Sequence, residues 1–300
     1  MDKMKISPKD LKSIKEAKGN LLPSEKDLQF YNEHGWYVSP IIIEDEVINA
    51  AMKGAEEFYA GILDHSLEND DRIENSSYSQ DKTIHNNEFV TLQKQALSQL
   101  GFHDLVLATA AILSGSKSIR LFADSLVSKD PSPDIKNNAV GWHTDKAYWP
   151  TCTSDQLLTA WIPLQDCTID MGPLFHIDKS HKWKDIEELK QYYSFNNQDL
   201  GGLEQHLKSR MPEYQEIPML LKKGQVSFHN CNTIHASRPN TSNLKRMALA
   251  MHFQDDTNKY QKAYKATGEL ISIGYDKLCR KDSAGNPDYS DPRIFPLLLH

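Results

Sequence analysis

The chain has no run of apolar residues long enough to cross a membrane, and it has no block of basic residues. A membrane-spanning helix needs about 20 consecutive apolar residues. The formal net charge is −7, so neither nucleic acid nor an anionic membrane surface is expected as a partner. Internal repeats and low-complexity segments are also missing. These absences leave a chain of ordinary globular composition.

Cysteine is scarce, and no two cysteines have the C-x-x-C spacing that is typical of metal sites and redox pairs. Residues 1–5 are charged and no apolar segment follows them, so no secretory signal is expected. We therefore expect a reducing, cytoplasmic environment with free thiols. Cys231 is expected to be a small buried hydrophobic residue and not a zinc ligand. The other cysteines are Cys152, Cys167 and Cys279.

The element pattern indicates one domain, with no second segment that could form its own core. Residues 1–20 are polar and rich in lysine, and they are expected to form a flexible arm. A single domain is expected over residues 21–300. Ser24 and Asp27 have the spacing of a capping box, which predicts a helix that ends at Gly35.

Two more helices are expected in the first half of the chain. One begins at Glu44 and carries apolar side chains at helical spacing as far as Ile62. The other covers residues 89–113. The polar residues 64–88 between them are expected to be a loop, and residues 260–300 an extended tail on the surface.

Short strands separated by turns follow the helices, which is typical of a β-sandwich or barrel with a helical flank. The fold class is therefore expected to be mainly β with flanking α-helices. Residues 194–216 lack a periodic pattern and are expected to be a substrate loop or a plain insertion. The expected strands are 36–38, 119–129, 139–145, 157–164, a strand leading from 225 to 235, and 246–253.

The segment Gly141–Trp149 contains a histidine and an aspartate two residues apart, His143 and Asp145. On an extended backbone these side chains point to the same side of a strand. An imidazole and a carboxylate can take adjacent positions on a divalent transition metal, and His235 is the best candidate for a third ligand. Two histidines and one carboxylate, with open positions opposite, form the ligand set of non-heme Fe(II) oxygenases.

An arginine, Arg246, follows His235 by eleven residues, and its guanidinium suits a bidentate carboxylate contact. The order His-x-Asp, a long gap, His-x-Ser and then this arginine resembles the phytanoyl-CoA dioxygenase family of Fe(II)- and 2-oxoglutarate-dependent oxygenases. The resemblance extends over roughly residues 20–255. It implies a double-stranded β-helix, a cupin-like jelly roll, with iron at its open end.

The resemblance also implies the cofactors, which are Fe(II), 2-oxoglutarate as co-substrate and O2. His143, Asp145 and His235 would be the catalytic iron ligands, and Arg246 would hold the distal carboxylate of the co-substrate together with Ser237. Related halogenases have glycine or alanine at the aspartate position, so Asp145 argues against halogenation.

Two more residues correspond to family positions near the co-substrate. Trp161 matches a family tryptophan, and Lys129 lies where a lysine often helps to hold the co-substrate. A core tryptophan and a solvated strand end are the plain alternatives. His229 and His252 are expected to support the site or to pack in the core, with a direct metal contact less favoured.

The expected reaction is oxidation of an unactivated C–H bond in a small metabolite or natural-product intermediate, with release of succinate and CO2. Hydroxylation is the simplest outcome, and desaturation or ring closure are alternatives. The substrate is not specified, because Tyr148 and Trp149 either line the pocket or pack in the core. The protein is expected to be a monomer or a homodimer.

Two other readings keep the metal site but not this chemistry. One is a non-redox metal-binding β-sandwich, such as a sugar-binding or storage module, and the other is a cupin-type zinc or manganese enzyme without a co-substrate. Neither needs a carboxylate-binding Arg246 with Ser237 beside it, so these two residues distinguish the readings.

Overall fold

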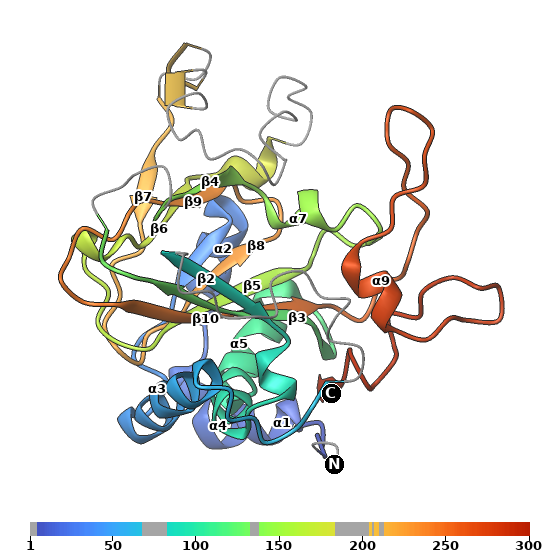
Figure 1. Ribbon diagram of the computed structural model, residues 1–300, viewed down its shortest axis with the longest axis horizontal. Coiled ribbons are helices and arrows are strands. Elements are labelled where there is room, and N and C mark those ends of the chain that lie inside the picture. Colours follow the sequence, from blue (N-terminus) through green and yellow to red (C-terminus); the bar gives the residue numbers. More distant parts are fainter. Residues whose placement is uncertain (1–4, 68–82, 133–137, 184–203, 206, 210–212) are drawn as a thin grey trace.

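The computed structural model describes residues 5–67, 83–132, 138–183, 204–205, 207–209 and 213–300. This part of the chain forms three layers (Figure 1): a group of helices, a seven-stranded sheet, and a four-stranded sheet on the opposite side. All strand pairs within the two sheets are antiparallel. The expected fold class, a double-stranded β-helix with flanking helices, is confirmed by this arrangement.

The larger sheet lies in the middle of the molecule. Its central strand is the long β10, which pairs with β5 on one side and with β3 on the other. β2 also pairs with β3, beside the path of the other strands. In spatial order the strands are β1 (Trp36–Val38), β8 (Ser227–Asn230), β5 (Leu158–Pro163), β10 (Arg246–Gln254), β3 (Ile119–Lys129) and β11 (Leu297–Leu299), with β2 (Ile84–Glu88).

The smaller sheet faces the middle strands of the larger one. From β3 to β10 the chain passes repeatedly between the two sheets, and this exchange of strands is what makes the fold a jelly roll. Side chains from the facing surfaces of both sheets therefore meet in one interior. In spatial order the strands are β4 (Val140–His143), β9 (His235–Ser237), β6 (Leu174–Ile177) and β7 (Glu216–Pro218).

Helices cover the other face of the larger sheet (Figure 1). Eight of the eleven residues of α5 are buried, because the helix lies between the sheet and the other helices. The remaining short elements connect the strands. The helices are α1 (Leu11–Lys18), α2 (Glu25–His34), α3 (Asp45–Tyr59), α4 (Gln95–Gly101), α5 (Asp104–Ser114), α7 (Asp145–Tyr148) and α9 (Gly274–Leu278), with short 3-10 turns at Gly19–Leu21, Val90–Leu92, Ile169–Met171 and Ser180–Lys182.

Period-two alternation along β10 and β5 divides their side chains between the two faces of the larger sheet. Leu249 and Met251 join the large apolar core beneath the helices. Ala248, Ala250 and Trp161 belong to a smaller apolar cluster between the sheets. Every polar residue that shares the inward face with them is therefore directed into the interior of the jelly roll.

The predicted capping box is confirmed at the start of α2. The side chain of Ser24 accepts a hydrogen bond from the Asp27 amide, and the Asp27 carboxylate accepts one from the Ser24 amide. The helix ends at Gly35, whose φ of +82° lies in the left-handed region that favours glycine. A Cβ at Gly35 would also collide with the ring of His181. The chain then enters β1 as expected.

Two expectations for the N-terminal half are wrong. The flexible arm contains helix α1, because Asp10 caps it and Ile14 is buried against the core. The loop expected over residues 64–88 ends in strand β2, whose backbone pairs with the otherwise open edge of β3. Neither feature has a strong pattern in its own short segment, and both depend on a partner far along the chain.

Two expected helices also differ in detail. Ile62 lies beyond the end of α3 and is 55% exposed, so the apolar stripe stops before it. The helix expected over residues 89–113 is divided into a 3-10 turn, α4 and α5. The break comes at His103, whose side chain accepts a hydrogen bond from the Leu105 amide and caps α5.

The C-terminal segment is more than the expected surface tail. β11 adds a strand beside β3, and Leu298 and Phe295 are buried in the main core. The buried Tyr289 donates a hydrogen bond to Asp276 of α9. The segment is held because β3 would otherwise lack backbone partners along part of its edge.

The segment 194–216, which is expected to be a substrate loop or a plain insertion, lies mostly outside the described residues. Among the described residues, no single helix is long and apolar enough to cross a membrane. Only α4 and α5 taken together, with a bend of 42° between them, meet the criteria of length and composition.

Candidate active site

The two histidines of the sequence motif stand side by side because their strands are neighbours. β4 and β9 pair with His143 directly opposite His235, and the ring centroids are 4.2 Å apart. The strand expected to run continuously into His235 is in fact two strands: β8 ends at Asn230, and a turn carries the chain to β9 in the other sheet. This change of sheet places His235 beside His143.

The sequence predicts that Asp145 lies on a strand. In the structure it is instead the first residue of the short helix α7. Thr144 before it is still extended, with φ −114° and ψ 146°, so the carboxylate stays on the side of His143. The chain turns there because the Lys146 amide donates to the carbonyl of Cys231 and the Ala147 amide to that of Thr144. The expected juxtaposition holds, although the expected strand ends earlier.

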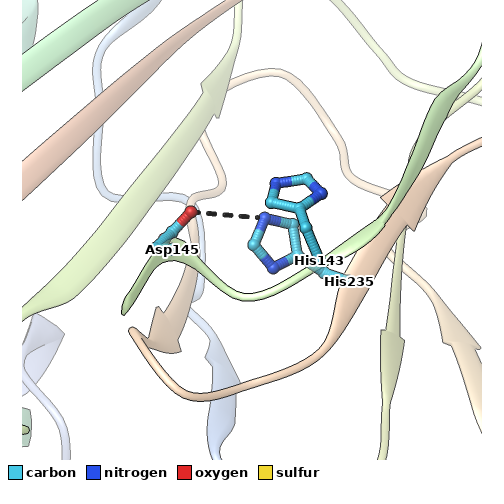
Figure 2. A group of neighbouring side chains, drawn as sticks. All are labelled: His143, Asp145 and His235. Atoms are coloured by element: carbon cyan, nitrogen blue, oxygen red, sulfur yellow. Dashed lines mark ion pairs between the residues drawn. The ribbon is translucent and has the colours of Figure 1, made fainter. Parts of the chain in front are cut away.

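The three side chains converge on one point, as Figure 2 shows. One potential ligand atom from each of His143, Asp145 and His235 lies within 4.8 Å of the others. Asp145 Oδ1 is 3.5 Å from His235 Nε2. Asp145 and His235 are buried, whereas His143 is partly exposed. Two imidazoles and one carboxylate at this spacing can hold one divalent transition metal ion.

Hydrogen bonds to backbone carbonyls orient both histidines toward this point. His143 Nδ1 donates to the Gly141 carbonyl at 2.7 Å, and His235 Nδ1 donates to the Thr233 carbonyl at 3.0 Å. Each Nε2 is therefore left with a lone pair for a metal. Burial lowers the pKa of both imidazoles. Both histidines are consequently neutral, which is the form that binds a metal.

The carboxylate of Asp145 is supported on its other oxygen. Oδ2 accepts hydrogen bonds from Thr159 Oγ1 at 2.5 Å and from His229 Nε2 at 3.2 Å. Burial opposes ionisation of Asp145, but the hydrogen bond from His229 outweighs it and holds the pKa of Asp145 well below the usual range. The site therefore carries one negative charge before any ligand arrives.

Three further histidines surround the three candidate ligands. His252 Nδ1 is hydrogen-bonded to Thr159 at 2.8 Å, so His229 and His252 both support Asp145, as expected. His176 of β6 lies opposite His235 in register, and its ring centroid is 4.7 Å from that of His229. Sequence reasoning missed His176 and Thr159. The alternation along β5 could have identified Thr159, because it directs Thr159 to the same side as Trp161.

Other candidates from the sequence have plain structural roles. Cys231 is a buried free thiol whose burial raises its pKa, and it is not part of the three-residue group. Trp149 is buried and packs edge-on against Phe122 and His252. Tyr148 is only partly buried, and its ring lies 5.3 Å from that of His143. Of the two aromatic residues after the motif, Tyr148 is the one positioned to meet a ligand.

A second group of charged side chains lies in the same interior. Arg246 and Lys129 are direct partners across β10 and β3, and both are fully buried. Lys129 Nζ donates to Ser237 Oγ at 2.7 Å and to the carbonyls of Ser237 and Arg238 at 3.3 and 2.8 Å. The alternative of a solvated strand end at Lys129 is therefore wrong, because Lys129 is fully buried between its neighbouring strands β10 and β2.

Arg246 has far fewer partners than its five N–H groups require. Its Nη2 donates to the Gly172 carbonyl at 3.2 Å, while Nε and Nη1 are buried and have no partner among the described residues. The guanidinium carbon lies 5.5 Å from the ring centroid of Trp161, which is a cation–π distance. Trp161 is thus both a core residue and a wall of the arginine site, so the two readings of it are compatible.

No carboxylate among the described residues forms an ion pair with Arg246 or Lys129. Burial lowers the pKa of Arg246 to about 10, and burial together with Arg246 lowers the pKa of Lys129 well below its usual value. Two buried like charges are costly unless an anion joins them. The unpaired N–H groups fit a carboxylate of a bound ligand.

A jelly roll with two histidines and a carboxylate in one interior, and an unpaired buried arginine beside them, is the arrangement of a non-heme iron oxygenase that binds an organic acid. The sequence model of the phytanoyl-CoA dioxygenase (PhyH) family matches residues 31–248. The chain therefore belongs to the phytanoyl-CoA dioxygenase family.

One curated relative is the bovine peroxisomal phytanoyl-CoA dioxygenase, which is 24% identical over 136 residues. The match covers 45% of this chain and 39% of the bovine protein, so this chain spans about two fifths of that relative. The similarity places the two proteins in one family and does not by itself transfer the bovine enzyme's substrate.

Solved structures share the fold over most of the chain. The 2-oxoglutarate-dependent carbocyclase SnoK from nogalamycin biosynthesis has a TM-score of 0.68 at 20% identity, covering 97% of this chain and 99% of its own. The epimerase SnoN from the same pathway has a TM-score of 0.64 at 19% identity, covering 91% and 97%. EctD from S. alaskensis, solved with 2-oxoglutarate and 5-hydroxyectoine, has a TM-score of 0.62 at 18% identity, covering 91% and 87%.

Proposed function

We propose that this enzyme hydroxylates an unactivated C–H bond of a small metabolite or natural-product intermediate. The observation that carries the proposal is that two groups of side chains in one interior both have binding atoms without a partner. One group offers two imidazole nitrogens and a carboxylate oxygen that converge within 4.8 Å. The other offers a buried arginine whose Nε and Nη1 are unpaired. A metal ion completes the first group and a carboxylate ligand completes the second.

The proposed metal ligands are Nε2 of His143, Nε2 of His235 and Oδ1 of Asp145. The hydrogen bonds from each Nδ1 to a carbonyl keep the two imidazoles in the required tautomer. When bound, Fe(II), 2-oxoglutarate and O2 supply the oxidising chemistry and release succinate and CO2. The three protein ligands leave open positions for the co-substrate and O2.

The proposed co-substrate site is formed by Arg246, Lys129, Ser237 and Trp161. Arg246 donates its free N–H groups to the distal carboxylate of 2-oxoglutarate in a planar fork. Ser237 Oγ already accepts a hydrogen bond from Lys129 Nζ, so its own hydroxyl proton remains available for a hydrogen bond to the ligand. Lys129 adds positive charge, and the indole of Trp161 lies against the guanidinium. This group excludes water from the carboxylate and fixes its position.

Hydroxylation is proposed as the reaction because the family name describes a dioxygenase and EctD was solved with a hydroxylated ligand, 5-hydroxyectoine. SnoK and SnoN, a carbocyclase and an epimerase, are evidence that the same fold supports other outcomes. Ring closure is the second candidate, since the SnoK match covers 97% of this chain. A small-molecule substrate is proposed because SnoN and EctD were solved with small-molecule ligands. The cytoplasmic location and the monomeric or dimeric state stay predictions.

The two readings without redox chemistry are less well supported. A storage or sugar-binding module, or a zinc or manganese cupin without a co-substrate, leaves the buried N–H groups of Arg246 without a role. Each unpaired buried polar group costs about 1–3 kcal/mol. A protein that never bound an anion here would be more stable with an apolar side chain at position 246.

An anaerobic titration tests the proposal. Fe(II) and 2-oxoglutarate are added to the protein without oxygen, and the weak visible charge-transfer band of the chelate is recorded. The band is expected with 2-oxoglutarate and absent with succinate, which lacks the keto group. Air and a panel of small metabolites are then added, and succinate release and product masses separate hydroxylation (+16 Da) from ring closure (−2 Da). A protein that binds Fe(II) but gives no chelate band would refute the assignment.

A further inference from the structure

We propose that Thr159 and His229 hold Asp145 so that only one of its carboxylate oxygens is available to the metal. The inference rests on the proposed function, in which Asp145 is a ligand. Thr159 and His229 contact the carboxylate and are positioning residues. A third residue, His252, acts on the carboxylate through Thr159.

The two oxygens of Asp145 have different contacts: one accepts hydrogen bonds and the other faces the candidate metal ligand His235. Oδ2 accepts from Thr159 Oγ1 at 2.5 Å and from His229 Nε2 at 3.2 Å, while Oδ1 faces His235 Nε2 at 3.5 Å. All four side chains are nine-tenths or more buried. Water therefore does not compete for Oδ2, and rotating the carboxylate would break two buried hydrogen bonds at once.

The direction of each proton follows from the acceptors. An ionised carboxylate only accepts, so the single hydroxyl proton of Thr159 points to Asp145. Thr159 Oγ1 can then only accept from its other partner, and His252 Nδ1 at 2.8 Å must be the donor. His252 lies 3.9 Å from Asp145 Oδ2, beyond hydrogen-bonding range. It therefore orients the hydroxyl of Thr159 instead of binding the carboxylate.

These supports form one row across three neighbouring strands of the larger sheet. Thr159 of β5 pairs with His252 of β10 on one side and with His229 of β8 on the other. Asp145 comes from the segment after β4, in the opposite sheet. Side chains of the larger sheet thus hold, across the interior of the jelly roll, a carboxylate that follows a strand of the smaller sheet.

The consequence concerns the number of open positions on the metal. Three protein ligand atoms leave three positions of an octahedron, which 2-oxoglutarate and O2 require together. A carboxylate that is free to rotate can bind the metal through both oxygens, and its second oxygen then occupies one of these three open positions. Because the row keeps Oδ2 occupied, it protects that open position and also fixes Oδ1 for the metal. Partners of metal ligands typically contribute about 10–100-fold in metal affinity or activity.

The test is a Co(II) titration of the metal-free protein, followed through the d–d absorption bands, which report coordination number. Thr159→Val and His229→Phe are each expected to lower Co(II) affinity about 10–100-fold and to change the band intensities. Thr159→Ser keeps a hydroxyl and should restore both. Thr109→Val is the matched control, because Thr109 is equally buried and its hydroxyl has no partner in the part of the chain that the structure describes. Wild-type affinity and bands in both Thr159→Val and His229→Phe would overturn the inference.

A double-mutant cycle tests the indirect role of His252. His252→Phe keeps an aromatic ring against Trp149 and should lower Co(II) affinity less than Thr159→Val does. Adding it to Thr159→Val should cause no further loss, because its route to Asp145 is already gone. Additive losses would refute that route. If Thr159→Val does not fold, which circular dichroism would reveal, His252→Phe and Thr159→Ser carry the test: wild-type bands in His252→Phe would then count against the inference.

Asp145→Ala distinguishes a failure of the proposed metal site from a failure of the positioning role alone. If that variant binds Co(II) as tightly as the wild type, the proposed metal site itself is wrong. If it loses the metal while Thr159→Val and His229→Phe bind normally, the metal site stands and only the positioning role fails.

Discussion

The three candidate metal ligands and the co-substrate arginine differ in how completely the chain satisfies their polar groups. At the metal end, the outer atoms of His143, Asp145 and His235 all have hydrogen-bond partners within the chain. At the other end, two nitrogens of Arg246 have no partner among the described residues, and Lys129 lies beside it as a second buried basic side chain. One end is preorganised, while the other is left electrostatically incomplete.

The difference reflects the charge of what each end receives. A cation is held by lone pairs, so the chain uses its N–H donors to fix the ligands from behind and leaves the lone pairs facing inward. A dicarboxylate is held by N–H donors, so those donors must remain unpaired until it binds. Among the described residues, Asp145 forms ion pairs with histidines and with neither Arg246 nor Lys129. The following predictions test this contrast, from the largest expected effect to the smallest.

Removing the only anionic ligand should abolish the metal end alone. Asp145→Ala is expected to lose stoichiometric Fe(II) binding and with it nearly all succinate release, because two neutral histidines remain. Metal content after dialysis and 2-oxoglutarate turnover measure this. Asp166→Ala is the control, since Asp166 forms an exposed pair with Lys222 and should leave both readings unchanged. Ordinary turnover by Asp145→Ala at low iron concentration would contradict the prediction.

Removing the guanidinium should affect the co-substrate end alone. Arg246→Met is expected to weaken 2-oxoglutarate binding by about 3–5 kcal/mol, because the ligand's buried carboxylate loses its partner. Arg246→Lys keeps the charge but not the planar fork, so its loss should be smaller. Titrating the co-substrate against metal-loaded protein measures both effects.

Arg238→Met is the matched control for that titration. Arg238 Nη2 pairs with Glu204 and Glu216, and its side chain is 42% exposed, so we expect no contact with the buried carboxylate of the ligand. Its replacement should leave 2-oxoglutarate affinity near the wild-type value, and iron content should stay constant in every variant. An unchanged affinity in Arg246→Met would remove the basis for the co-substrate site.

The lowered pKa of Lys129 predicts a pH dependence for the incomplete end. Between this lowered pKa and the unfolded value of 10.5, the unfolded chain binds more protons than the folded one, so ligand-free stability should rise with pH. A bound dicarboxylate favours the charged lysine, so 2-oxoglutarate affinity should fall over the same window. Calorimetry in two buffers of different ionisation enthalpy should show proton uptake on binding. Lys129→Met should abolish both trends, and their persistence would point to another group.

The smallest effect is expected at Ser237. Ser237→Ala removes one of the three acceptors of Lys129 Nζ and leaves the carbonyls of Ser237 and Arg238 in place. The expected loss of 2-oxoglutarate affinity is about 1 kcal/mol, with no change in iron binding. A loss as large as that of Arg246→Met would mean that Ser237 contributes as much as Arg246 to the carboxylate contact.

Much of the site could be predicted from residue types and spacing. The ligand candidates His143, Asp145 and His235 and the arginine at position 246 stand in short motifs, and local backbone geometry sets where such side chains point. The capping box at Ser24 was readable for the same reason. Strand β2, by contrast, was missed because its short polar segment is ordered by pairing with β3, more than thirty residues away.

The sequence by itself determined which side chains this protein offers to a metal and to an acid, because a ligand set is a matter of chemical type and near spacing. Only the tertiary structure decided which of the other buried residues serve them. The row of Thr159, His229 and His252, and the apposition of Arg246 and Lys129, depend on the register between strands that are distant in the chain. Register is set by packing over whole sheets, since a shift of one residue would turn every one of these side chains to the other face.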